Sequence, residues 1–179
     1  MVTTRLLTAQ DLWKLGDSAE TYEIIDGEFA PMVPPSGEHG AIQATLISSL
    51  RHVVMHANLG RVYGESGYVL QHNPDVVLAP DISFIAGVRV PADQTGYLDL
   101  APDLAIEIVS PSKSPGEIEQ RLAIYLRTGV RSIWIVYPRD RQVVVHAPGN
   151  APSFFKATDE LTGGEVVPGL SFPVSELFE

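Results

Sequence analysis

A strand-like run from Asp103 to Ser110 carries one carboxylate among apolar side chains, and this run constrains the fold most. Two sets of residues alternate along it: Leu104, Ile106 and Ile108 in one, and Ala105, Glu107 and Val109 in the other. Successive side chains of a strand point to opposite faces of a sheet, so Glu107 shares a face with Ala105 and Val109. Such neighbours predict a half-buried face, where a lone carboxylate is costly.

Helical patterns precede and follow this run. From about residue 38 to 57, apolar residues recur at three- and four-residue steps: Ile42, Leu46, Leu50 and Val53. A capping-box pattern over residues 114–117, with proline at the first helical position, predicts a second helix that ends near Arg127. A shorter helix is expected over residues 8–15.

The remaining patterns are strands and turns. The Asp26-Gly27 pair between apolar runs predicts a hairpin. Further strands are expected over residues 61–70, 75–85, 103–110, 132–136 and 142–146, and the tail over 165–178 is interpreted as a short strand, a Pro-Gly turn and a last apolar turn. Strands and helices alternate only partly. The order predicts an α/β (α+β) fold in which a mixed β-sheet is flanked by helices.

The length of 179 residues favours one domain. We expect an N-terminal helix and hairpin over residues 1–37, a core over 38–147 and a C-terminal tail over 148–179. The absence of cysteine excludes disulfides, thiolate metal sites and a cysteine nucleophile. No secretion signal or membrane-spanning apolar run is visible, so the expected location is cytoplasmic.

The formal net charge of −10 argues against strong binding to nucleic acid, because phosphate contacts need lysine and arginine. Between Lys113 and Gln142, however, six basic residues stand against three acidic ones. This window is interpreted either as a basic face or as the scattered arginines that any soluble domain has on its surface.

Asp81, which follows Pro80, and Glu107 are the candidate chemical pair. Two carboxylates from adjacent strands can bind a hard divalent cation such as Mg²⁺, which activates water and stabilises charge on a phosphoryl group. The alternative is that Asp81 is a surface residue and Glu107 pairs with a basic neighbour. The spacing of 26 residues does not decide between them.

Several segments resemble the PD-(D/E)xK nuclease superfamily, and in particular the bacterial putative restriction endonuclease domains of Uma type. They lie across nearly the whole chain, over residues 22–28, 80–84, 102–112, 125–130, 134–138 and 168–170. Together these segments are specific, whereas any one alone is weak. The resemblance implies a restriction-endonuclease-like core.

The resemblance also implies roles for individual residues. Asp81 and Glu107 would ligate Mg²⁺ (or Mn²⁺), and the main-chain carbonyl of Ile108 could add a ligand. The lysine of the motif is replaced by Val109. The position on the following helix that matches it is Arg121, which can grip a phosphate but cannot act as a base. Lys113, in the loop just after the strand, is another candidate to replace the lysine of the motif.

Three histidines and one further acid are weaker candidates. His39, at a helix N-terminus, is either a base or phosphate contact in the pocket or a semi-buried structural histidine. Glu65 is either an extra acid near the metal or a bulge residue. His52 and His56 have the spacing of a zinc pair, but no third ligand is evident and a solvated face is expected.

Two functions follow as hypotheses. The first is a Mg²⁺-dependent endonuclease that hydrolyses DNA phosphodiesters, with weak, salt-sensitive DNA binding and a homodimer if both strands are cut. The second is a catalytically weak or inactive protein of the same fold that acts in self-association or partner binding. The Val109 and Arg121 departures and the acidic charge motivate the second. Substrate sequence, strandedness and biological role are not encoded in any pattern found.

Overall fold

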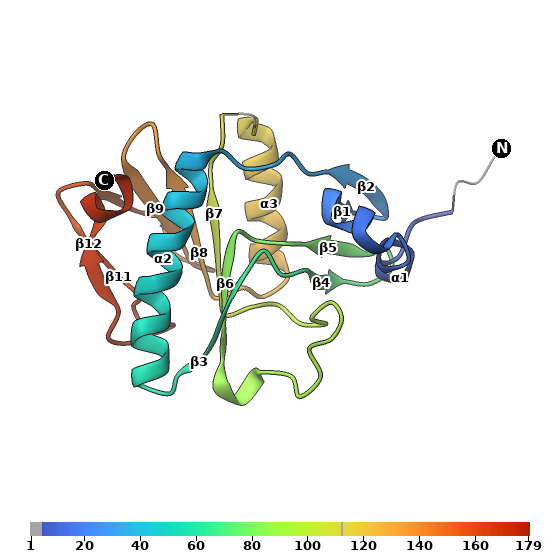
Figure 1. Ribbon diagram of the computed structural model, residues 1–179, viewed down its shortest axis with the longest axis horizontal. Coiled ribbons are helices and arrows are strands. Elements are labelled where there is room, and N and C mark those ends of the chain that lie inside the picture. The colour runs from blue at the N-terminus through green and yellow to red at the C-terminus, as the bar shows by residue number, and fades with distance from the viewer. Residues whose placement is uncertain (1–4, 112) are drawn as a thin grey trace.

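The computed structural model describes residues 5–111 and 113–179, and a six-stranded sheet forms its centre (Figure 1). The strands run in the order β10-β9-β8-β7-β6-β3. Their bounds are Ser153–Lys156 (β10), Gln142–His146 (β9), Ser132–Tyr137 (β8), Leu104–Ile108 (β7), Ile82–Ala86 (β6) and Gly60–Gly64 (β3). β7 and β8 are parallel, and the other neighbours are antiparallel. The predicted mixed sheet flanked by helices is confirmed.

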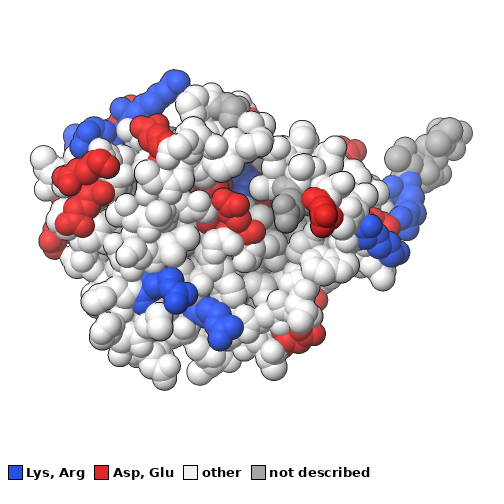
Figure 2. Space-filling view, viewed as in Figure 1, with Lys and Arg blue, Asp and Glu red and all other residues white. Residues whose placement is uncertain are grey.

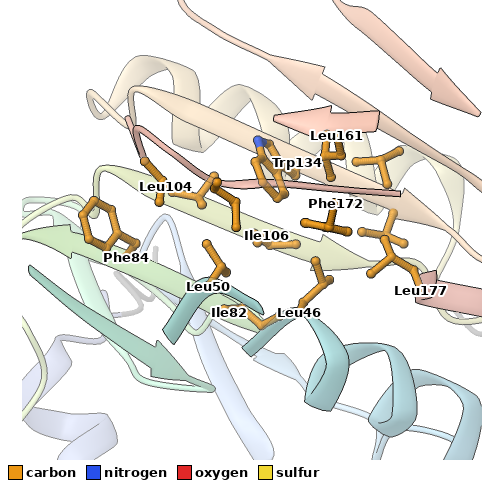
Figure 3. Packing of buried hydrophobic residues seen from close by; sticks show 14 of the residues in the cluster. Leu46, Leu50, Ile82, Phe84, Leu104, Ile106, Trp134, Leu161, Phe172 and Leu177 are labelled. Carbon is orange, nitrogen blue, oxygen red and sulfur yellow. The ribbon is translucent and has the colours of Figure 1, made fainter. Parts of the chain in front are cut away.

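Two helices cover the two faces of this sheet (Figure 1). Helix α2 (Gly37–His56) packs Ile42, Leu46 and Leu50 against one face, where the C-terminal segment also packs. The side chains in this layer include Leu104, Ile106 and Trp134 from β7 and β8 (Figure 3). Helix α3 (Pro115–Arg127), which connects the parallel pair, covers the other face.

The alternation predicted for β7 therefore has a direct structural consequence. Leu104, Ile106 and Ile108 point to the α2 face, whereas Ala105 and Val109 pack on the α3 face. Glu107 alternates with the same set as Ala105, so its carboxylate faces α3. All five residues of β7 are buried.

A second sheet, of four strands, lies beside the first (Figure 1). Its order is β2-β1-β5-β4, with bounds Glu28–Pro31 (β2), Tyr22–Ile25 (β1), Val76–Leu78 (β5) and Tyr68–Gln71 (β4). β1 and β2 form the predicted hairpin, whose turn residues Asp26 and Gly27 have φ angles of 51° and 80°. Helix α1 (Ala9–Trp13), capped by Thr8 as expected, precedes the 3-10 helix η1 (Gly16–Thr21) and packs on this sheet.

Two predictions of a single long strand are wrong, because each of these runs forms two shorter strands. The run over residues 61–70 splits into β3 and β4, and the run over 75–85 splits into β5 and β6. The first break contains Glu65, whose φ of 43° interrupts the extended chain. The second break contains Pro80, which has no N–H to donate to a ladder. In both cases the chain leaves one sheet and enters the other.

The C-terminal segment also departs from its predicted pattern. The strands are β11 (Glu160–Thr162) and β12 (Ser171–Pro173), which pair with each other, and a 3-10 helix, η3 (Val174–Phe178), ends the chain. Residues 165–167 form a turn rather than the predicted strand, because Val167 donates to the carbonyl of Gly163.

A further 3-10 helix, η2, spans Gly87–Arg89, after β6. No helix among the described residues combines the length and apolarity needed to cross a membrane.

Candidate active site

A pocket of about 240 Å³ opens where β7 ends and β6 begins. The N-terminus of α2, the hairpin β1–β2 and the first turns of α3 form its walls. Residues 30–35, at the end of β2 and in the loop after it, supply an apolar wall. The charged and polar lining residues are Thr21, Glu23, His39, Glu65, Asp81, Ser110, Lys113, Glu117, Gln120 and Arg121. Figure 2 shows acidic side chains at the centre of one face of the molecule, with a basic side chain visible beside them.

The sheet register brings Asp81 and Glu107 together. Ile82 pairs with Ile106 in the antiparallel ladder, so extending the register by one residue sets Asp81 opposite Glu107. Side chains opposite each other in such a pair project to the same face. The main-chain N–H of Ile108 donates to Oδ2 of Asp81 at 2.6 Å, which fixes the carboxylate at the end of β7.

Glu107 is held at both carboxylate oxygens. Arg121 Nη2 and the Tyr125 hydroxyl each donate to Oε1 at 2.6 Å. Lys113 Nζ donates to Oε2 at 3.0 Å. Ion pairing with a basic neighbour, one of the two interpretations of Glu107, is therefore present in the structure, and it coexists with the carboxylate pair.

Arg121 also reaches a residue that the sequence reasoning missed. Its Nη1 donates to Oε2 of Glu23, on β1, and its Nη2 contacts the carbonyl of Ala79 at 3.3 Å. The other oxygen of Glu23 accepts from the N–H of Ala79 at 2.7 Å. Glu23 and Arg121 thus clamp the segment that leads into Asp81.

The sequence contained a signal for one of the missed residues. Tyr125 follows Arg121 by four positions in the predicted helix, and residues at that spacing share a helix face. Glu23 lies in a family-like segment, but it is 98 residues from Arg121 and belongs to the other sheet, so only the tertiary structure joins them.

Charge in the pocket is unbalanced. The three buried carboxylates, those of Glu23, Asp81 and Glu107, face two cations, Lys113 and Arg121. Burial, the largest cause, and the nearby charge of Glu107 together raise the pKa of Asp81 to about 7 against the opposing effect of Lys113. Burial also acts to raise the pKa of Glu107, but the charges of Arg121 and Lys113 outweigh it and lower that pKa to about 2. Asp81 therefore carries the uncompensated charge.

This imbalance predicts a pH dependence of stability. The pKa of Asp81 is about 7 in the folded protein and 3.8 as the ordinary value, so the folded state binds the extra proton between these pH values. Stability from this group is complete below about pH 4 and is lost as the pH rises to about 7. The difference in free energy of unfolding between Asp81→Asn and the wild type should grow over this range, by on the order of 3 kcal/mol, and then level off. Urea unfolding at pH 4.5, 6 and 8 measures it, and a constant difference would contradict the assignment.

His39 lies at the start of α2, where Ser36 caps the helix. Its Nε2 is 3.1 Å from Oδ2 of Asp81, but neither ring nitrogen has a hydrogen-bond partner among the described residues. Burial lowers the pKa of His39, assisted by the charge of Lys113, so the ring is neutral near pH 7. A neutral imidazole in this position can accept a proton.

Of the other weak candidates, Glu65 lies at the pocket, whereas His52 and His56 lie on an exposed face of α2. Glu65 lies in a turn that lines the pocket, and its Oε1 accepts from Gln43 Nε2 at 3.1 Å. His52 and His56 are exposed on α2 with ring centroids 4.5 Å apart, which confirms the expected solvated face. Ser112, part of one family-like segment, lies outside the described residues.

The basic residues between Lys113 and Gln142 do not form one continuous basic face. Lys113 and Arg121 enter the pocket and pair with Glu107. Arg127 pairs with Asp26, and Arg131 pairs with Asp103. Four of the six basic residues are thus paired with carboxylates.

The residues of the pocket fit a hard divalent cation with water ligands. Asp81 and Glu107 are opposed, and the N–H of Ile108 points toward Asp81, which directs its carbonyl to the same edge of the strand. Among the described residues, no group of three or more His, Cys, Asp or Glu side chains is arranged to hold a metal. Mg²⁺ commonly binds through one or two carboxylates and keeps several waters, so a third acidic ligand is not required.

Comparisons with known proteins agree with the observed fold. The family model Uma2, described as "Putative restriction endonuclease", matches residues 9–175. A crystal structure of a putative nuclease of the DUF820 group from Anabaena variabilis ATCC 29413 is similar, with a TM-score of 0.84 and 25% sequence identity. The match covers 96% of this chain and 97% of that one. No curated protein matches the sequence.

Proposed function

Because this chain belongs to the Uma2 family of putative restriction endonucleases, we propose that it is a Mg²⁺-dependent endonuclease that hydrolyses DNA phosphodiester bonds. The family match and the nuclease-like fold support a nuclease. The observation that carries the finer proposal is the opposition of Asp81, which lines the pocket, and the buried Glu107, which binds two cations of the pocket wall.

Asp81, Glu107 and the carbonyl of Ile108 would hold the metal, which, when bound, supplies an activated water and stabilises negative charge on the phosphate. Mn²⁺ would suit the same oxygen ligands. His39, neutral and within 3.1 Å of Asp81, accepts a proton released as water attacks phosphorus. The P–O bond to the leaving oxygen breaks, and that oxygen takes up a proton from solvent.

The two cations serve this reaction differently. Arg121 binds Glu107 and Glu23 and keeps both carboxylates in place. Lys113 lies in the pocket wall, where an ammonium group contacts an incoming phosphate. With a net charge of −10 and most nearby arginines paired, binding to DNA should be weak and steeply dependent on salt. Cleavage of both strands would need two such sites, which a homodimer supplies.

A second function is favoured by one specific observation. Both oxygens of Glu107 are already engaged by protein donors, and the position of the motif lysine is occupied by Val109. The same network would suit a protein that keeps the fold for self-association or partner binding. Calorimetric titration with Mg²⁺ and Mn²⁺ separates the two functions, because only the endonuclease requires metal binding at millimolar concentration.

The assay for the proposed activity is cleavage of supercoiled plasmid at low salt with Mg²⁺ or Mn²⁺. We expect nicked and then linear DNA, suppressed by a chelator and by about 200 mM salt. The Asp81→Ala variant, purified in parallel, is the control for contaminating nucleases. Cleavage that persists in this variant, or a wild type that leaves the plasmid intact under all these conditions, would contradict the proposal.

A further inference from the structure

The two cations of the pocket are held in very different ways. The side chain of Arg121 is 9% exposed, and its two terminal nitrogens together contact Glu23, Glu107, Ala79 and Tyr125. Removing either carboxylate would leave a buried charged group without its partner. The terminal nitrogens of Arg121 are therefore engaged by protein acceptors, and its Nε is buried.

Lys113 is held loosely by comparison. Its side chain is 29% exposed and comes from the connection between β7 and α3, rather than from either element. Its ammonium group donates to Oε2 of Glu107 at 3.0 Å. A lysine ammonium is a compact charge on a flexible stem, so this group can move while its backbone stays in place.

The position of this ammonium group is what gives it a further role. Lys113 and Asp81 line the pocket, whereas Glu107, 3% exposed, is not among the described residues that line it. The ammonium of Lys113 thus covers the outer oxygen of Glu107 on the pocket side.

We infer that Lys113 is an exchangeable counter-ion, which a divalent cation must displace from Oε2 of Glu107 before it can bind both carboxylates. This inference rests on the proposed function for the identity of the incoming cation. A dication neutralises the opposed pair of carboxylates better than one ammonium does. Once displaced, the ammonium remains tethered to the pocket wall, where it is free to contact the phosphate of a substrate.

The test is calorimetric titration of the whole chain with Mn²⁺ in the absence of DNA. Lys113→Met keeps a stem of similar length without the charge, and we expect it to bind Mn²⁺ about tenfold more tightly than the wild type, because the ammonium group no longer competes for Oε2 of Glu107. Lys14→Met, at an exposed position after α1, is the matched control and should bind like the wild type. Circular dichroism and urea unfolding establish that each variant is folded.

The outcomes distinguish this inference from the proposed activity. Tighter binding in Lys113→Met without cleavage by the wild type supports the counter-ion and refutes the endonuclease. Cleavage by the wild type, together with equal or weaker Mn²⁺ binding in folded Lys113→Met, overturns the counter-ion and leaves the endonuclease standing. Absence of Mn²⁺ binding in both proteins refutes both.

Discussion

Replacing Arg121 with methionine should lower the free energy of unfolding by about 3–5 kcal/mol, because the change leaves two buried carboxylates without their shared cation. Glu23 and Glu107 both lie at most 8% exposed at their side chains and both bind this guanidinium. The loss arises from uncompensated buried charge rather than from lost packing, since methionine retains most of the apolar stem. Urea unfolding at pH 7 measures the change.

A second arginine on the same helix provides the control for this prediction. Arg127 pairs with Asp26 at 3.2 Å, but both side chains are about half exposed. Exposed pairs of this kind contribute at most about 1 kcal/mol, so Arg127→Met should change stability little. If Arg121→Met does not fold, Arg121→Lys keeps one positive charge and should fold with a smaller loss. Equal small effects at positions 121 and 127 would contradict the buried network.

Replacing Asp81 with asparagine should separate activity from stability. The rate of metal-dependent cleavage is expected to fall by at least about 10³-fold, because a metal ligand is lost. The free energy of unfolding at pH 8 without metal should rise by on the order of 3 kcal/mol, since the variant removes a buried carboxylate with a pKa of about 7. The amide oxygen can still accept from the N–H of Ile108. Plasmid cleavage and urea unfolding of one preparation measure both changes.

Asp99→Asn is the matched control for this variant. Asp99 is exposed and pairs with His72 at 3.0 Å, and His72 is not one of the residues around Asp81 and Glu107. It should leave both cleavage and stability at wild-type values. An Asp81→Asn protein that cleaves within tenfold of the wild type would show that Asp81 is not a metal ligand. One that is less stable than the wild type at pH 8 would show that Asp81 is not an unfavourable buried charge.

The sequence predicted the local structure well wherever periodicity and capping residues agreed. Helices α2 and α3, the hairpin at Asp26-Gly27 and the alternation along β7 follow directly from spacing. The resemblance to the Uma-type family is confirmed by the match over residues 9–175. Periodicity failed where one apolar run crosses from one sheet to the other, because both halves of such a run have strand propensity and only the break residues mark the boundary.

In the site, too, contacts between neighbouring elements were predicted from the sequence, whereas contacts between distant elements were not. The opposed positions of Asp81 and Glu107 were expected from adjacent strands, and the structure brings His39, Lys113 and Arg121 to the same pocket. The role of Arg121 could not be derived from its place on the helix, because its second partner, Glu23, lies 98 residues earlier. Spacing along a helix gives the direction of a side chain, but the partner there depends on how the two sheets pack.

A crystal structure of the wild-type protein soaked in Mn²⁺, with anomalous diffraction data, tests the metal-binding pocket most directly. We expect one anomalous peak between the carboxylates of Asp81 and Glu107, within bonding distance of the Ile108 carbonyl, and Nζ of Lys113 moved away from Oε2 of Glu107. The same soak of Asp81→Asn crystals should lack the peak. A wild-type pocket without anomalous density, in which Lys113 still binds Glu107 at millimolar Mn²⁺, would contradict a metal-dependent nuclease site.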